Sequence, residues 1–209
     1  MAEVVLGNVY DKYASTNPVA RRLVGNYLRT LDALLEHIQP RRILEVGCGE
    51  GYLAQRVARA HSDRTVIGVD LSADLFPPRH EDSRTAFAVQ SAYALGFPGG
   101  SFDLVLGAEV LEHLENPAAA LQEMVRVSRR DLLLSVPREP LWRLLNLARG
   151  AYVRDWGNTP GHLQHWSSNG FLRFLEGFGT IREVRRPLPW TMVWLEKRDG
   201  AAPADRRNP

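Results

Sequence analysis

The sequence predicts an α/β fold: a doubly wound, mostly parallel sheet of seven strands, with helices on both faces and an antiparallel last strand. Three observations lead to this fold class. Short β-branched runs alternate with amphipathic helical patterns along most of the chain, which is typical of parallel strands joined by crossover helices. The first run ends in a glycine-rich turn, as happens where a helix begins beside a ligand. The last two strand runs are separated only by Pro187, Leu188 and Pro189, a link too short to hold a crossover helix.

Length and composition are those of one globular domain. The chain has 209 residues, of which 44% are hydrophobic and 24% charged, and its formal net charge is +2. That charge is too small to indicate nucleic-acid binding by itself, and none is expected. A single cysteine, Cys48, excludes an internal disulfide and a metal site made of cysteines. No stretch reaches the ~18 apolar residues of a transmembrane helix, and the start does not resemble a signal peptide, so we expect a cytoplasmic protein.

Capping residues and apolar periodicity predict the elements of the first half. Asn17 and Pro18 are typical of a helix start, and apolar residues at helical spacing extend this helix to about Pro40. The elements expected after it are a strand at 41–47, a helix at 52–60, a strand at 65–70, a short helical piece broken at 77–78 and a strand at 85–89. Each strand is a short β-branched run, as buried strands are.

The second half continues the alternation up to its last two strands. Asn116 and Pro117 open another helix, with one face formed by Leu121, Met124, Val125 and Ser128. The other expected elements are strands at 102–107 and 131–136, a helix at 168–177, and two strand-like runs at 180–187 and 190–198. Because these last runs follow each other so closely, they should pair antiparallel. Residues 199–209 have no apolar pattern, so we expect a disordered tail.

The stretch ILEVGCGEG (43–51) places three glycines on alternate residues at the end of the first strand. Glycine costs conformational entropy, so a closely approaching group or a positive φ should require it there. Asp70 ends the next strand, 21 residues after Gly49, and this spacing suits hydrogen bonds to ribose hydroxyls. The turn and the acid together indicate a ligand that carries a ribose, most simply one that contains adenosine.

The spacing of the glycines bears on which ligand binds. A dinucleotide fingerprint reads G-x-G-x-x-G, and Tyr52 stands where its third glycine belongs. Glu45, in the strand before the turn, would oppose a pyrophosphate but can order the turn or receive an ammonium group. We therefore favour a ligand with a zwitterionic amino-acid tail over NAD. Binding of NAD would instead imply an oxidoreductase. Cys48 lies inside the turn as a small spacer rather than an obvious nucleophile.

Four motifs resemble those of class I S-adenosylmethionine-dependent methyltransferases, specifically the type 11 domain that acts on small molecules. They are LEVGCGEGYLA, VIGVDLS, FPGGSFDLVLGAEVLEHLENP and LLLSVP, in the family's order and spacing, and the resemblance covers about residues 10–197. It implies a Rossmann-like fold with one catalytic domain over residues 1–198. Within that domain it implies an N-terminal helical cap at about 8–39 and a substrate lid inserted at about 138–166. The implied cofactor is S-adenosyl-L-methionine, the product S-adenosyl-L-homocysteine, and the partner a small-molecule acceptor.

The resemblance assigns the methionine and ribose contacts of the cofactor. Glu45, Gly47, Gly49 and Gly51, with Cys48 among them, match the turn that packs against the methionine part. In the next strand, the acid at position 70 matches the residue that holds both ribose hydroxyls.

The adenine contacts are assigned in the same way. Leu71 matches the apolar contact on adenine, and Ala92 takes the place whose backbone faces the adenine edge. Ser91 stands where the family usually has aspartate, and its hydroxyl can still accept a hydrogen bond. Ala108 and Glu109 resemble residues that close over the cofactor.

Two segments are candidates for covering the site. Tyr10 and Tyr13, in YDKY, resemble an N-terminal segment that can cover the cofactor. Residues 139–156 carry one apolar helical face, made of Leu141, Leu144, Leu145, Ala148 and Tyr152. We expect this helix to pack on the edge of the sheet. The alternative is a lid, in which Leu144 and Leu145 cover an apolar or anionic acceptor, and a peripheral membrane contact is less favoured.

His113, His162 and His165 are the candidate bases for an acceptor that must lose a proton. His165 is ranked first, because Trp166 beside it could hold the ring against an apolar wall. The alternatives are a solvent-side helix end for Glu112 and His113, and hydrogen bonding within a loop for the other two histidines. A metal needs more ligands than His162 and His165 offer, so no metal is expected.

The implied reaction is an in-line displacement at the methyl group of a sulfonium, for which positioning can supply much of the acceleration. A noncatalytic S-adenosylmethionine-binding regulatory module is the main alternative, because folds outlive their activities. A nucleic-acid methyltransferase is disfavoured, since GAEVLEH (107–113) stands where an Asn-Pro-Pro-Tyr-like motif would follow the fourth strand. The sequence indicates neither the acceptor nor the oligomeric state.

Overall fold

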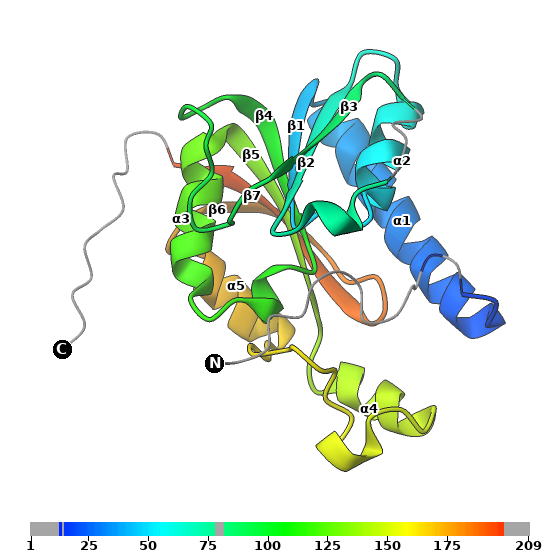
Figure 1. The fold of residues 1–209 in the computed structure, drawn as a ribbon. Helices are drawn as coiled ribbons and strands as arrows, with labels where there is room; N and C mark the ends of the chain where they lie inside the picture. The colour runs from blue at the N-terminus through cyan, green and yellow to red at the C-terminus, as the bar shows by residue number, and fades with distance from the viewer. Residues whose placement is uncertain (1–12, 14, 78–81, 199–209) are drawn as a thin grey trace.

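A seven-stranded sheet forms the centre of the computed structural model, which describes residues 13, 15–77 and 82–198 (Figure 1). The strands are β1 Arg42–Val46, β2 Thr65–Asp70, β3 Thr85–Val89, β4 Phe102–Ala108, β5 Ser128–Pro137, β6 Gly179–Arg185 and β7 Trp190–Lys197. Their order in the sheet is β3-β2-β1-β4-β5-β7-β6. All neighbours up to β5 pair parallel, whereas β7 runs antiparallel to both β5 and β6. The predicted fold class, including the antiparallel last strand, is confirmed.

Two of the helices, α1 and α3, begin at the Asn-Pro pairs that predicted them. They are α1 Pro18–Ile38, α2 Tyr52–Ala60, α3 Pro117–Val127, α4 Leu141–Ala148 and α5 Ser168–Leu175, with 3-10 turns η1 Ala73–Leu75, η2 Leu111–His113 and η3 Val153–Asp155. The side chains of Asn17 and Asn116 accept hydrogen bonds from the first-turn N–H groups of α1 and α3. Ser128 was expected on one face of α3, and this expectation is wrong. It begins β5, where its hydroxyl donates to the carbonyl of Asp131.

Each central strand sends alternate side chains to opposite faces of the sheet. Ile43 and Leu104 pack in the core beneath α1 and α2. Their sequence neighbours, Leu44 and Val105, pack in the core beneath α3 and α5. Figure 1 shows these two pairs of helices on either side of the sheet. Both faces of the strands are buried, which is why their apolar residues are consecutive rather than alternating.

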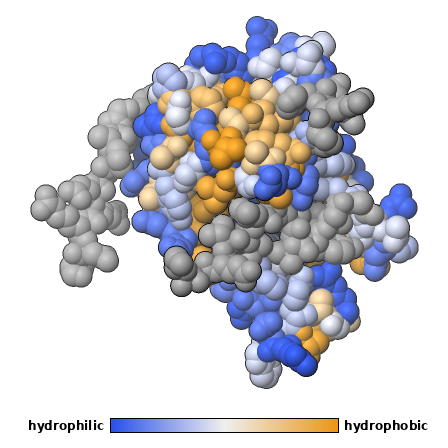
Figure 2. Space-filling view, viewed as in Figure 1, coloured by the Kyte–Doolittle hydropathy of each residue, from blue (hydrophilic) through white to orange (hydrophobic). Residues whose placement is uncertain are grey.

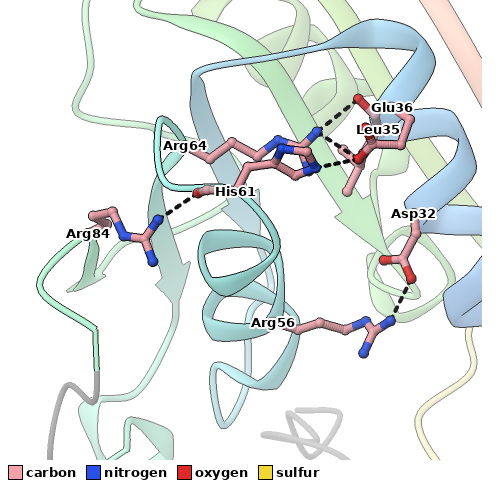
Figure 3. Close-up of polar contacts among 7 residues, drawn as sticks. All are labelled: Asp32, Leu35, Glu36, Arg56, His61, Arg64 and Arg84. Atoms are coloured by element: carbon pink, nitrogen blue, oxygen red, sulfur yellow. Dashed lines mark hydrogen bonds and ion pairs between the residues drawn. The ribbon is translucent and has the colours of Figure 1, made fainter.

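Polar contacts fasten α1 to the chain before β2 (Figure 3). The Arg64 guanidinium donates to the Leu35 carbonyl and to the Glu36 carboxylate, both at 3.2 Å. The same carboxylate lies 2.6 Å from Nε2 of His61, whose carbonyl accepts from Arg84 at 2.6 Å. The hydrogen bond with His61, assisted by Arg64, holds the pKa of Glu36 below its usual range. These contacts lie at the amino end of β2, opposite the glycine turn, so they brace the fold without entering that edge.

After β5 the chain leaves the body of the domain, and α4 projects from it (Figure 1). Residues 141–159 are called the α4 unit below. Trp142, in its first turn, packs against Trp190 of β7 with ring centroids 5.8 Å apart. Beyond that turn, the prediction that the apolar face of this helix packs on the edge of the sheet is wrong. Leu144 is 59% exposed, and the buried residue of α4 is Asn146. The helix also ends before Tyr152, whose φ of 54° is not helical.

The buried amide of Asn146 holds the α4 unit together. Its Nδ2 donates to the carbonyl of Gly157 at 2.8 Å and to Oγ1 of Thr159 at 3.2 Å. The indole N–H of Trp142 donates to the same hydroxyl at 2.9 Å.

Among the helices in the described parts of the chain, none has both the length and the apolar character that crossing a membrane requires.

Candidate active site

The glycine turn lies at the carboxyl edge of the sheet, where the strand order reverses. β2 and β3 lie on one side of β1 and β4 on the other, the position at which ligands bind in sheets of this type. Gly47, Gly49 and Gly51 have φ values of 71°, 50° and 71°, which side chains disfavour. A Cβ on Gly47 would lie 2.6 Å from Cγ2 of Val110, and one on Gly51 would lie 2.5 Å from the Phe87 ring. Backbone conformation therefore favours glycine at all three positions, and close packing also requires it at Gly47 and Gly51.

Asp70 ties the turn to the end of β2. Its Oδ2 accepts from the N–H of Gly49 at 2.8 Å, and its Oδ1 accepts from the N–H of Leu71 at 2.7 Å. A carboxylate offers about four acceptor positions, so each oxygen can still accept a hydroxyl. The acid thus orders the turn as well as facing the place where a ribose is expected.

Glu45 and Cys48 lie beneath the turn. Glu45 is 2% exposed in β1. The thiol of Cys48 faces Gly68 of β2, where a Cβ would come within 2.8 Å of the sulfur. Burial raises the pKa of this thiol far above its usual value, and the charges of Glu45 and Asp70 raise it further. A thiol in this state is a poor nucleophile, which agrees with its expected role as a spacer.

Tyr13 lies over the acidic side of the turn. Its ring stacks on Tyr52 with centroids 4.0 Å apart and planes 13° apart. Burial raises the pKa of Tyr13 well above its usual value, and the nearby carboxylates of Glu109 and Glu45 raise it further. Tyr13 therefore lies near the ends of β1 and β4, and Tyr52, singled out in the sequence only as a missing glycine, is its partner. Tyr10 falls outside the described residues.

The backbone is strained where β4 ends. Glu109 has a φ of 58°, a value that is uncommon for residues with a side chain. Its N–H donates to the carbonyl of Ser135 in β5 at 3.0 Å, so the neighbouring strand holds this conformation. Strain of this kind gathers at functional sites. Ala108 and Glu109 lie next to the glycine turn, because the following Val110 packs on Gly47.

The residues expected to contact adenine lie after β2 and β3. Leu71 is 50% exposed, so its apolar side chain is accessible just after β2. The hydroxyl of Ser91 accepts from the N–H of Tyr93 at 3.2 Å, and Ala92 packs against the core beneath α3. Figure 2 shows an apolar area on the front of the body, over the strands beside α3. Val89, at the end of β3, is another exposed apolar residue.

A brace on α3 holds the loop that follows Ser91 and Ala92. The Arg126 guanidinium donates to the carbonyls of Leu95 and Phe97, at 2.7 and 2.8 Å, and pairs with Glu123 at 2.6 Å. The Glu123 carboxylate also accepts from the N–H of Leu95 at 2.9 Å. This brace was not predicted from the sequence, although Glu123 and Arg126 lie one helical turn apart.

The structure brings two of the three candidate histidines together. The rings of His113 and His162 lie 4.9 Å apart at 77°, and Nδ1 of His113 lies 2.9 Å from the carbonyl oxygen of Gly161. Glu112 joins them, since one ligand atom from each of these three side chains lies within 4.8 Å of the others. Glu112 is 1% exposed, so the alternative of a solvent-side helix end for this residue is wrong.

His165 lies apart from this cluster. Its Nε2 lies 2.7 Å from the amide oxygen of Asn158, and burial together with Arg143 lowers its pKa. Trp166 packs instead against Phe171 and Phe174, with centroids 5.5 and 5.4 Å away. The packing of Trp166 thus differs from the one for which His165 was ranked first, and a role of His165 as the base stays a prediction.

Leu144 and Leu145 lie on the α4 unit, which follows the carboxyl end of β5. Leu144 is exposed and Leu145 is half-buried. In Figure 2 the projecting part of the molecule carries a small apolar area among hydrophilic residues. Leu144 is therefore accessible outside the core, and a role of the two leucines in covering an acceptor stays a prediction.

Comparisons with known proteins agree with this arrangement. Residues 44–135 match a family model described as a methyltransferase domain. The 2-methyl-6-phytyl-1,4-hydroquinone methyltransferase of Synechocystis sp. is 30% identical over 74% of this chain, and the chain spans about half of that protein, 52%. The ubiquinone biosynthesis O-methyltransferase of Methylococcus capsulatus is 31% identical over 66% of this chain and 67% of its own length.

A solved structure shows the same fold. The magnesium protoporphyrin IX methyltransferase from Synechocystis, crystallised with bound SAH, superposes with a TM-score of 0.63. The alignment covers 90% of this chain and 94% of the other, at 19% sequence identity.

Proposed function

The chain belongs to the class I S-adenosylmethionine-dependent methyltransferases, and we propose that it transfers a methyl group from S-adenosyl-L-methionine to a small-molecule acceptor. The observation that carries this proposal is the glycine turn with positive φ, tied to Asp70 at the point where the strand order reverses. A cofactor with a ribose and an amino-acid tail fits the chemistry of this edge. S-adenosyl-L-homocysteine is then the second product.

Each part of the cofactor has a suitable group in the chain. The free acceptor positions of Asp70 suit two ribose hydroxyls, and the exposed side chain of Leu71 suits one face of adenine. The backbone at Ala92 and the hydroxyl of Ser91 suit the adenine edge. Glu45 and Glu109 supply negative charge on the side where an ammonium group would lie, and Tyr13 covers that side.

The remaining glycine-turn residues shape the methionine end. Gly47 and Gly51 let the backbone pass close to Val110 and Phe87, Gly49 supplies a positive φ between them, and Cys48 fills the space beneath without reacting. The sulfonium supplies an activated methyl and its own leaving group, so the chain has mainly to position two reactants and exclude water.

The acceptor should approach from the side of Glu112, His113 and the α4 unit. We infer an acceptor with an apolar body, because the α4 unit presents Leu144 outside the core. We also propose that the protein is cytoplasmic. Two relatives are named for methyl transfer to a hydroquinone and in ubiquinone biosynthesis, which is consistent with an acceptor of this kind. Residues 138–166 then form the lid of one catalytic domain that spans residues 1–198.

Calorimetry followed by methyl transfer tests the proposal. S-adenosyl-L-methionine and S-adenosyl-L-homocysteine should bind, and NAD should bind much more weakly. With radiolabelled cofactor, the chain should label the small-molecule fraction of a cell extract. Preference for NAD would overturn the cofactor assignment. Tight binding of S-adenosyl-L-methionine with no labelled product in any fraction would instead favour the noncatalytic binding module.

A further inference from the structure

The cluster of Glu112, His113 and His162 offers three metal-ligating side chains from two separate segments. Glu112 and His113 belong to η2, directly after β4, and His162 lies in the loop before α5. One ligand atom from each lies within 4.8 Å of the other two. We propose that these residues bind a divalent transition-metal cation beside the methyl-transfer site.

The hydrogen bond of His113 prepares its ring for this role. A carbonyl oxygen can only accept, so the contact with the Gly161 carbonyl requires Nδ1 of His113 to carry the hydrogen. In the neutral ring Nε2 then keeps its lone pair. Metal-ligating histidines commonly donate their other N–H to a carbonyl or carboxylate, which fixes the tautomer and the direction of the ring.

The two ligand-bearing segments are also locked to each other. The Glu112 carbonyl accepts from the N–H groups of Leu163 and Gln164, at 2.8 and 2.9 Å. The Gln164 amide donates to the Leu114 carbonyl at 3.1 Å. These bonds hold the loop that carries His162 against η2 without using the ligand atoms themselves. A site preorganised in this way loses less entropy when a cation binds.

An aromatic wall supports the other histidine. The Trp142 ring lies parallel to the ring of His162 within 29°, with centroids 6.1 Å apart. Both Glu112 and His162 are buried, and His113 is half-buried. Burial of imidazole and carboxylate beside an indole limits access of water, which strengthens binding of a cation by the few ligands present.

The donor set points to the class of cation. Two imidazoles and one carboxylate suit Zn²⁺, Co²⁺, Mn²⁺ or Fe²⁺ better than Mg²⁺ or Ca²⁺, which prefer oxygen ligands. In a tetrahedral zinc site the ligands lie about 2.1 Å from the metal, hence about 3.4 Å from each other. The ligand atoms that are farthest apart must therefore close by up to about 1.4 Å around the ion. Three protein ligands leave a fourth position for a water or a substrate.

The cation could bind the acceptor at that open position, an inference that rests on the proposed function. An acceptor hydroxyl bound there would lose its proton to solvent more easily, because a divalent cation lowers the pKa of an oxygen that it binds. The oxygen would then form its bond to the methyl carbon while the bond between carbon and sulfur breaks. Sulfur keeps that electron pair and becomes a neutral thioether. The inference thus specifies an oxygen acceptor.

Metal binding is measured first, without cofactor or acceptor. The purified 209-residue chain is stripped with a chelator, dialysed and titrated with Co²⁺ and Zn²⁺ by absorption spectroscopy and calorimetry, with Mg²⁺ as the comparison. We expect one Co²⁺ or Zn²⁺ per chain and much weaker Mg²⁺ binding. Glu112→Gln, His113→Gln and His162→Gln should each weaken Co²⁺ binding at least tenfold. His165→Gln, the matched control outside the cluster, should leave it unchanged.

Two results would overturn the site: no stoichiometric Co²⁺ or Zn²⁺ binding to the wild-type chain, or equal loss in the control variant. Circular dichroism of each variant separates lost ligands from lost folding, and a crystal soaked in Zn²⁺ should show anomalous scattering at the cluster. If the ion binds but labelled methyl transfer is unchanged by its removal, the acceptor role is overturned. Because metal binding is measured alone, absence of methyl transfer contradicts only the proposed function.

Discussion

The carboxylate of Asp70 has two expected roles: it orders the glycine turn, and it faces the position expected for the ribose. Two of its acceptor positions are used by the N–H groups of Gly49 and Leu71. The others are available to a ligand. A residue with both roles should affect binding and stability together when it is removed.

Asp70→Ala should weaken S-adenosyl-L-homocysteine binding at least tenfold. A hydrogen bond to a charged group contributes about 1.5–3 kcal/mol, and 1.4 kcal/mol is about tenfold in affinity. The melting temperature should fall as well, because two backbone N–H groups lose their acceptor. Calorimetry and thermal unfolding measure the two effects. Asp74→Ala, an exposed acid in η1, is the control, and unchanged affinity in Asp70→Ala would remove this residue from the site.

The separation of the histidines is also decided at single residues. His113 faces Gly161 and His162, whereas His165 faces Asn158 on the α4 unit. Spacing along the chain does not predict this separation, because His162 is much closer in sequence to His165 than to His113. The base of the reaction should therefore be sought at the Glu112 cluster, either as an imidazole or as a ligand to a cation.

At the scale of elements, α3 supports the adenine side of the site from a distance. Arg126 holds the carbonyls of Leu95 and Phe97, and Glu123 holds Arg126. The loop so fixed follows directly after Ser91 and Ala92. Loosening this brace should alter the cofactor site although no residue of α3 is expected to touch the cofactor.

The brace should also make stability depend on pH. The hydrogen bond with Arg126 holds the pKa of Glu123 below its usual range, with help from the N–H of Leu95. A carboxylate with a lowered folded-state pKa contributes stability above its unfolded value, about 4.3, and loses that contribution as the pH falls through the folded value. Glu123→Gln should therefore be less stable than wild type at pH 7, with the difference shrinking towards pH 3.

Urea unfolding at pH 7, 5 and 3 measures this difference. Calorimetry at pH 7 should show weaker S-adenosyl-L-homocysteine binding to Glu123→Gln, since the loop after Ser91 is less constrained. Glu115→Gln, an exposed acid before α3, is the matched control and should follow wild type. A stability difference that stays constant with pH would contradict the role of the Glu123 charge.

At the scale of the whole molecule, the candidate site lies where two cores meet. Leu44 and Ile43 point to opposite cores from the same strand, and β1 then ends in the glycine turn. Tyr13 and Tyr52 close one side of this edge, and the α4 unit stands near the other. A ligand that binds here contacts elements from both halves of the sheet and should stabilise the fold as a unit.

S-adenosyl-L-homocysteine at 100 times its dissociation constant should raise the melting temperature by about 5–11 °C. Binding to the folded state alone adds about 2.7 kcal/mol at that concentration, and each kcal/mol shifts a chain of this size by about 2–4 °C. Tyr13→Ala should reduce the shift because the stack on Tyr52 is lost, whereas Tyr13→Phe keeps the ring and should resemble wild type. A shift unaffected by Tyr13→Ala would show that this ring does not cover the cofactor.

Local sequence signals were enough for the fold and for part of the site. Asn-Pro caps, β-branched runs and the short link at 187–189 predicted the helices, the parallel strands and the antiparallel β7. The pairing of Gly49 with Asp70 was also predictable, because parallel neighbouring strands end at one edge. These features depend on backbone preferences within a few residues, or on the regular geometry of a sheet.

Only the tertiary structure decided which distant side chains meet. Periodicity predicted an apolar face on α4 but not that the chain would leave the sheet after β5, because burial depends on what packs opposite. The stack of Tyr13 on Tyr52 joins residues from different segments, and so does the cluster of Glu112 with His113 and His162. Such contacts follow from the path of loops, and loops are fixed by hydrogen bonds such as those from Leu163 and Gln164 rather than by any repeating pattern.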